Sequence, residues 1–142
     1  MKLVKILSII ALSGMLFNSC SPSTQITNLN VKKTPFYTTS WKLIGEDNTL
    51  IKGFNSENVS IKFNEQSNSV NGYAGCNQFT STLIIDEAIV KLGPIVSTKM
   101  ACPMSKVEDN FLKLLKEANR FDIKGKELYF YKDNILLLKL ID

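Results

Sequence analysis

Alternating apolar and polar positions dominate the chain from residue 41 onward and predict short β-strands. Val59-Ser-Ile-Lys-Phe63 is the clearest example, because an apolar residue recurs at every second position, as in a strand with one buried face. Trp41 heads the first such segment and is expected to be a core residue. The segments with this pattern are 41–44, 49–54, 59–63, 69–73, 79–85, 88–92, 95–98, 121–124, 128–131 and 135–141, and we expect seven to nine strands from them.

Residues 106–119 instead have the spacing of an amphipathic helix. Ser105, with Glu108 three residues later, predicts a capping box at the start of this helix. One helix among many short strands predicts a mainly β (α+β) fold, a small curled antiparallel sheet or barrel with the helix packed on it or plugging it. The apolar face of the helix would consist of Val107, Phe111, Leu114, Leu115 and Ala118.

The last segment, residues 135–141, is apolar at nearly every position. A strand that is apolar on both faces is expected to be covered on both faces. Strict alternation would place Leu136, Leu138 and Leu140 on one face, and Ile135, Leu137 and Ile141 on the other.

The N-terminus has the order of an export signal. Lys2 and Lys5 precede an apolar run over residues 6–17, which is shorter than the ~17 to 25 residues of a membrane-spanning helix. Cys20 stands where a lipoprotein signal places its acylated cysteine, although Phe17 occupies a position that is usually leucine. We therefore expect a signal peptide over residues 1–19 and a lipid anchor, with acyl chains such as palmitate, on Cys20. An ordinary secretory signal with an incidental cysteine is the alternative.

Residues 20–39 are polar and rich in Ser, Thr and Asn, with Pro22 and Pro35, and are expected to form a flexible tether. An ordered arm that packs on the domain is the alternative, and the apolar residues that would allow it are Ile26, Leu29, Val31, Phe36 and Tyr37. Residues 40–142 would then form one globular domain, since 44% of the chain is apolar and 21% charged.

The charge balance argues against a nucleic-acid partner. Removing residues 1–19 leaves 15 basic residues against 13 acidic ones, and no basic run is longer than Lys32-Lys33. The row of cations that neutralises phosphates is therefore missing. Ser21, directly after Cys20, resembles the sorting context of outer-membrane lipoproteins. We expect the protein to be held at the outer membrane of a bacterial envelope, facing the periplasm.

Cys76 and Cys102 are the two cysteines left in the domain, and in an exported protein this count favours a disulfide. Two free buried thiols are the alternative. The spacing is not the Cys-x-x-Cys of redox pairs, and a zinc site would need two more ligands from a chain without histidine.

No catalytic residue, cofactor or metal site is expected. The lack of histidine removes the commonest general base and with it the usual Ser-His and Cys-His nucleophiles. Adjacent carboxylates occur at Glu46-Asp47, Asp86-Glu87 and Glu108-Asp109, and each pair lies in an expected turn or at the helix start. An enzyme would have to assemble carboxylates from distant strands, so we expect a protein that is not an enzyme.

Two elements together carry a family resemblance: Asn71-Gly-Tyr-Ala-Gly-Cys-Asn-Gln-Phe79, and Ser97-Thr-Lys-Met-Ala-Cys-Pro103 just before the helix. With them, residues 40–141 resemble a META domain of the heat-shock-protein HslJ type. The motif positions are Gly72, Gly75, Cys76, Asn77 and Phe79 in the first element, and Thr98, Met100, Ala101, Cys102 and Pro103 in the second.

This resemblance implies a small curled β-barrel with one helix, in an envelope lipoprotein associated with stress tolerance, and it implies no reaction. The motif residues are expected to be mostly structural, with Asn77 bonded to the backbone of its own turn. We expect a non-enzymatic lipoprotein that acts through an envelope protein partner. The alternatives are a carrier of an apolar ligand, such as an acyl chain inside the barrel, and an enzyme that uses strand-borne carboxylates.

Overall fold

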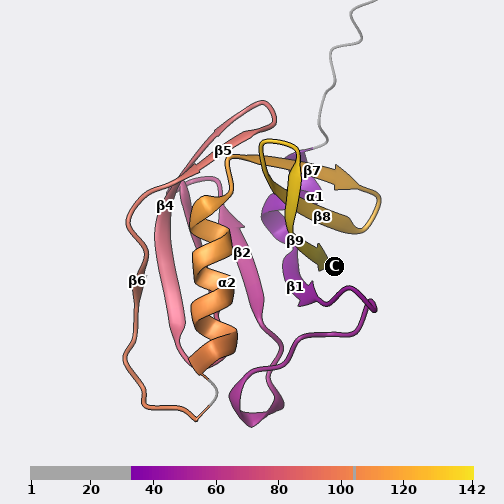
Figure 1. Cartoon of the computed structure of the whole chain (residues 1–142). Coiled ribbons are helices and arrows are strands. Elements are labelled where there is room, and N and C mark those ends of the chain that lie inside the picture. The colour runs from indigo at the N-terminus through magenta and orange to yellow at the C-terminus, as the bar shows by residue number, and fades with distance from the viewer. Residues whose placement is uncertain (1–32, 104) are drawn as a thin grey trace, which may run out of the picture.

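The computed structural model describes residues 33–103 and 105–142, and Figure 1 shows their arrangement. Most of the predicted strands and the main helix are found close to their expected bounds. The elements are α1 (Lys33–Thr38), β1 (Ser40–Ile44), the 3-10 turn η1 (Phe54–Ser56), β2 (Ser60–Asn64), β3 (Ser69–Tyr73), β4 (Gln78–Asp86), β5 (Ile89–Leu92), β6 (Val96–Ser97), α2 (Ser105–Glu117), β7 (Arg120–Lys124), β8 (Glu127–Lys132) and β9 (Ile135–Ile141).

The strands form a closed antiparallel barrel. Their order is β3-β2-β1-β9-β8-β7-β5-β4, and β4 pairs again with β3 to complete the circle. The short strand β6 continues beyond β5 along the same side of β4. The seam between β5 and β7 has one directly paired position, Ile89 with Arg120. The expected fold class, a small antiparallel barrel with one main helix and a disulfide, is confirmed.

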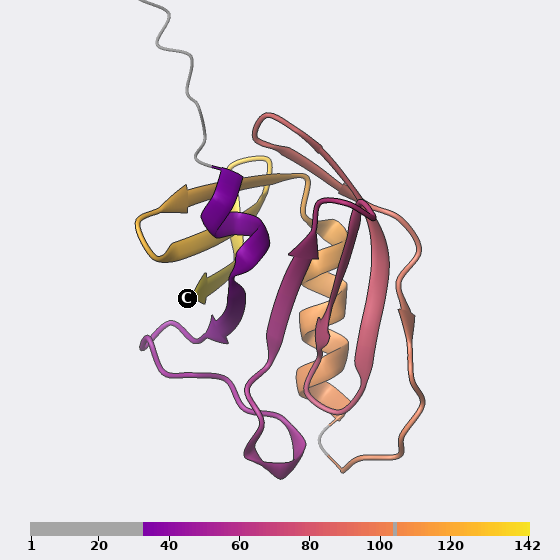
Figure 2. The same ribbon diagram turned by 180° about the vertical axis from the view of Figure 1, so that it is seen from behind.

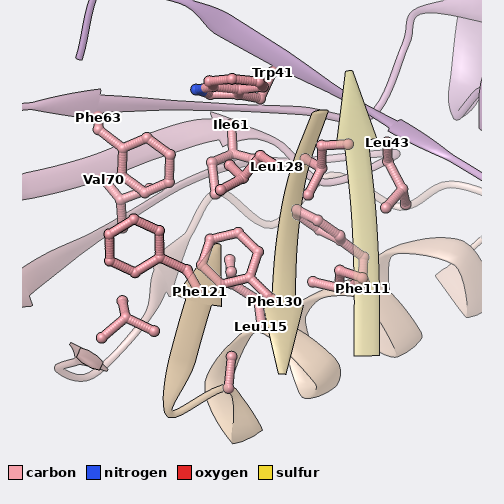
Figure 3. Close-up of a cluster of buried hydrophobic side chains, with 14 of the residues drawn as sticks. Trp41, Leu43, Ile61, Phe63, Val70, Phe111, Leu115, Phe121, Leu128 and Phe130 are labelled. Atoms are coloured by element: carbon pink, nitrogen blue, oxygen red, sulfur yellow. The ribbon is translucent and has the colours of Figure 1, made fainter. Parts of the chain in front are cut away.

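α2 packs against the inner side of the barrel strands and supplies part of the core. Seen from opposite sides in Figures 1 and 2, the helix lies on one side of β2 and β4. Phe111 and Leu115 on the helix are buried in the same cluster as Trp41 and Phe130 on the strands (Figure 3), and Ala118, just after the helix, belongs to it as well. None of the helices in the described ranges combines the length and the apolar character needed to cross a membrane.

A β-bulge changes the expected faces of β9. The register between β8 and β9 shifts at Phe130/Tyr131, so that Leu138 is opposite Phe130 whereas Leu136 is opposite Tyr131. A one-residue shift moves the side chain to the other face of the sheet. Leu138 and Leu140 are buried as expected, but Leu136 is exposed. The prediction that Leu136 shares their face was therefore wrong.

The expected tether ends earlier than residue 39. Residues 33–38 form α1, and the ring of Phe36 stacks on Phe63 at 4.0 Å and on Phe121 at 5.1 Å between centroids. The indole nitrogen of Trp41 donates to the carbonyl oxygen of Phe36. The alternative of an ordered arm is thus correct for residues 33–39, because a buried aromatic ring offsets the entropy of ordering the helix. The expected signal peptide, Cys20 and the tether up to residue 32 lie outside the described residues.

The predicted strand over residues 49–54 is also wrong. This segment makes two isolated bridges, Ile44 with Leu50 and Lys52 with Asn58, and then the turn η1. Positive φ angles at Asn48 and Asn55 turn the chain on both sides of the segment, so no ladder extends through it.

Truncating Phe36 to alanine tests whether α1 belongs to the domain. Phe36→Ala should lower the free energy of unfolding by about 3 kcal/mol, because it empties a ring-sized volume between Phe63 and Phe121. Chemical denaturation of the mature chain measures the effect. Ser40→Ala, at an exposed position a few residues later, should change it by less than about 0.5 kcal/mol. Equal stability of the two variants would mean that α1 does not support the core.

Candidate functional site

The corner between β3 and β4 requires glycine at two contacting positions. Gly75 has φ +123°, a conformation that side chains of L-residues rarely adopt. A Cβ placed on Gly53 would lie 2.0 Å from the carbonyl oxygen of Gly75, so the two backbones can approach only without side chains. The amide of Phe54 donates to that carbonyl at 2.6 Å. The loop after β1 is thereby fixed to the corner.

Asn77 and Glu108 join this corner to the start of α2. One carboxylate oxygen of Glu108 accepts hydrogen bonds from the amides of Cys76, at 3.2 Å, and Asn77, at 2.6 Å. The other oxygen accepts from the Asn77 side-chain amide at 2.9 Å. Hydrogen bonds to a charged acceptor are the stronger kind. The first turn of the helix is therefore fastened to the hairpin by three donors.

The oxygen of the Asn77 side chain holds the second motif element. It accepts hydrogen bonds from the hydroxyl of Thr98 at 2.8 Å and from the backbone amide of Met100 at 2.7 Å. The Thr98 hydroxyl also accepts from the amide of Gln78 at 3.2 Å. Asn77 is buried, and both ends of its side-chain amide are thus satisfied by distant parts of the chain.

The Cys76–Cys102 disulfide closes the same arrangement covalently. The two Cα atoms are 6.0 Å apart, and the bridge spans 26 residues. In the chain-entropy account a loop of this length stabilises the fold by about 3.5 kcal/mol. The expected disulfide is confirmed. We use "motif cluster" for Asn77, Thr98, Met100, Glu108 and the Cys76–Cys102 bridge.

The other expected motif residues surround this cluster. Gly72 lies in β3, where a Cβ would be 2.0 Å from the carbonyl oxygen of Ser60 on β2. Phe79 is buried in β4 against Phe111 of α2, with ring centroids 5.7 Å apart. Ala101 and Pro103 are exposed. The side chain of Met100 is exposed as well, although its backbone amide is held.

Two residue roles differ from expectation. Asn77 does not bond its own turn, because its side chain reaches segments 21 to 31 residues away. Glu108 was expected to cap its own helix, whereas its carboxylate accepts from the corner of the β3–β4 hairpin. Glu108 and Gly53 were thus missed as site residues. A glutamate in the first helical turn gave only a local signal, and Gly53 lay in a segment predicted to be a strand.

Two acidic side chains in the described ranges are hydrogen-bonded within their own turn or hairpin. Asp47 accepts from Thr49 within one turn, which lowers the pKa of its carboxyl group. Glu127 has a lowered pKa because it accepts from Lys139 and Tyr129 on the barrel exterior. Within residues 33–103 and 105–142, Cys, Asp and Glu side chains do not gather in a group able to hold a metal ion. Burial raises the pKa of the Tyr73 hydroxyl, which lies 2.8 Å from the Gly75 carbonyl oxygen.

The family is decided by a match over most of the chain. The model of the META domain matches residues 30–140, which include both motif elements and the helix that follows them. This chain belongs to the META domain family. Its META domain starts before the boundary at residue 40 that the sequence suggested, in agreement with the packing of α1. No curated protein matches the chain.

Solved structures share the fold of this META domain at low sequence identity. A protein from Burkholderia xenovorans, solved by NMR, is 18% identical, with a TM-score of 0.60 over 78% of this chain and 86% of that one. A DUF4847 family protein from Bacteroides vulgatus, solved by crystallography, is 12% identical, with a TM-score of 0.55 over 78% of this chain and 96% of that one. At these identities the likeness concerns the fold alone.

Replacing Glu108 tests the motif cluster. Glu108→Gln should lower the free energy of unfolding by about 2 kcal/mol. The neutral amide loses the charge-assisted hydrogen bonds, and its NH2 group would face N–H groups that need an acceptor. Asp109→Asn removes the same charge from the next, exposed residue of the helix and should change the stability by less than about 0.5 kcal/mol. Denaturant unfolding with the disulfide intact compares the two. Equal losses of stability in the two variants would mean that Glu108 acts only through its negative charge at the start of the helix.

Proposed function

We propose that this chain is a non-enzymatic lipoprotein of the bacterial envelope, anchored through Cys20 at the outer membrane, whose META domain supports stress tolerance by binding a protein partner. The observation that carries the proposal is a segment, residues 96–101, that is held rigidly yet presents apolar side chains to solvent. We assign the partner to this segment.

The backbone of the segment is fixed at several points. β6 pairs with β4, Thr98 and Met100 are bonded to Asn77, and Cys102 follows in the disulfide. A surface that is already ordered loses little conformational entropy when a partner binds. Rigidity of this kind favours recognition, and it also explains why the motif residues beneath the segment are so closely bonded.

The exposed side chains of the segment suit a protein contact. Val96 is 64% exposed and Met100 is 58% exposed. Methionine is flexible and polarisable and is common at protein-binding surfaces. Both residues project from a frame that needs neither of them for its own packing, which leaves them available to a partner.

The carrier alternative has less support. Trp41, Phe63, Phe111 and Phe130 are almost completely buried and fill the interior that an acyl chain would occupy (Figure 3). The lining residues of one small hollow, of about 140 Å³, include Tyr37, Glu65 and Asn68, so it lies at one end of the barrel and is partly polar. A pocket for an apolar chain is larger and mostly apolar.

The enzyme alternative needs carboxylates that converge with perturbed pKa values. The pKa values of the Asp47 and Glu127 carboxyl groups are lowered by hydrogen-bond donors in their own turn or hairpin. Neither arrangement supplies an acid and a base facing one substrate. We therefore advance partner binding alone.

Site-specific photocrosslinking in cells tests the partner surface. A photoreactive amino acid at Met100 should give a discrete adduct with a second protein, whereas the same amino acid at Lys113, on the exposed side of α2, should not. The variant Met100→Ser should bind the partner more weakly than the unchanged protein. The domain should still fold, because the Met100 side chain is exposed. The assignment is wrong if both positions give the same adducts or if neither gives any.

Mass spectrometry of the protein from its own membranes tests the anchor. The mature chain should begin at Cys20 and carry acyl chains, and Cys20→Ala should release it from the membrane fraction. A native mass spectrum of the same sample also tests the alternative that the protein carries an apolar ligand. A stoichiometric apolar molecule that is lost on denaturation would replace partner binding as the leading function.

A further inference from the structure

Four outward-facing residues on neighbouring strands form a continuous row across the barrel. Ile89 on β5 is paired with Arg120 on β7, Arg120 with Tyr131 on β8, and Tyr131 with Leu136 on β9. Directly opposed residues of antiparallel strands project to the same face. We call Ile89, Arg120, Tyr131 and Leu136 the exterior row. It exists because the β-bulge in the β8–β9 pair turns Leu136 outward.

The exterior row has exposed aliphatic residues on either side of a cationic aromatic centre, and on β4 the same face continues with Asp86, directly opposite Ile89. Ile89 is 58% exposed and Leu136 is 50% exposed, and Ile135 beside the β8–β9 turn is 67% exposed. The guanidinium carbon of Arg120 lies 4.3 Å from the centre of the Tyr131 ring. Aliphatic tips flanking tyrosine and arginine are the combination that suits a bilayer interface, where amphipathic rings and cations lie at headgroup level.

Cations and carboxylates are mixed around the exterior row, and Asp86 beside Ile89 adds a carboxylate. Lys132 is paired with Glu117 at 3.4 Å, and Arg120 donates to the carbonyl oxygen of Asp133 at 3.3 Å. Asp133 in turn accepts from the side chain of Asn119. A rim of mixed charge gives no strong attraction to anionic lipid, so this surface needs a separate anchor to stay on a bilayer.

The described chain begins at the same end of the barrel. Phe36 of α1 contacts Phe121, the residue that follows Arg120, and Lys33 is only three residues earlier. In Figure 1, α1 and the tip of the β4–β5 hairpin lie toward the same end of the molecule. Twelve residues separate Lys33 from Cys20, a connection that spans at most about 40 Å. An anchor at Cys20 therefore keeps the domain close to the bilayer, with the α1 end as its point of attachment.

We propose that the exterior row rests on the lipid bilayer, with Ile89 and Leu136 at the boundary between headgroups and acyl chains. The proposal rests on the lipid anchor at Cys20 proposed above. α2 starts at the motif cluster and runs for 13 residues, about 20 Å, to Glu117, three residues before β7 begins. The orientation therefore points Met100 away from the membrane and toward a partner in the aqueous space.

Spin labelling of the full acylated chain tests this orientation. Labels at Leu136→Cys and at the control position Lys113→Cys are read on vesicles of phosphatidylethanolamine and phosphatidylglycerol, after flotation has shown that the protein is bound. Both positions are exposed, so the label should not disturb the fold. The ratio of collisions with oxygen, which concentrates in lipid, to collisions with a water-soluble nickel chelate should be several-fold higher at 136 than at 113. Unacylated Cys20→Ala protein should show equal ratios at the two positions.

Each other outcome has a distinct meaning. Failure of the acylated chain to float with vesicles would overturn the anchor, and this orientation with it. Flotation with equal ratios at 136 and 113 would overturn the orientation and leave the anchor intact. A label at 136 shielded from both oxygen and the nickel chelate would show a second protein chain on the exterior row, which would replace the bilayer as its occupant.

Discussion

The hydrogen bonds of the buried Asn77 side chain are the interaction on which the motif cluster depends. Its oxygen accepts two hydrogen bonds and its amide nitrogen donates one, so a single planar group connects a hairpin corner, the segment at Thr98–Met100 and the first turn of α2. In a poorly hydrated site such bonds strengthen one another, and the loss of one leaves the remaining partners unsatisfied. The disulfide then holds together parts that the amide has already aligned.

Local patterns were enough to predict most of the fold. The spacing of apolar residues shows which side of a strand or helix is buried, and this information is local. Examples are the period-two alternation in Val59–Phe63 and the helical spacing from Val107 to Ala118. The count of two cysteines, in a domain that the sequence suggested is exported, was enough to predict the bridge between Cys76 and Cys102. The sequence allowed two shapes for the same strands, a curled open sheet and a closed barrel, and did not decide between them.

The features that were missed depend on contacts between distant residues. Phe36 lies in a polar stretch and becomes part of the core only because Phe63 and Phe121 meet around it. Leu136 faces outward because of one extra residue in a ladder, which no alternation pattern can reveal. Glu108 has the sequence of a capping residue, and its role is visible only when the β3–β4 corner is placed beside the helix.

The position of β9 in the barrel governs when the fold can form. β9 lies between β1 and β8, and Lys42 of the first strand is paired with Ile141 of the last. A pairing this distant in sequence pays nearly the largest loop-closure entropy that the domain can have, and such topologies fold slowly. A chain that is still being synthesised or threaded through a pore can therefore form separate hairpins but not the barrel. Folding is completed only after β9 is free to pair, and loss of β9 would open the barrel between β1 and β8.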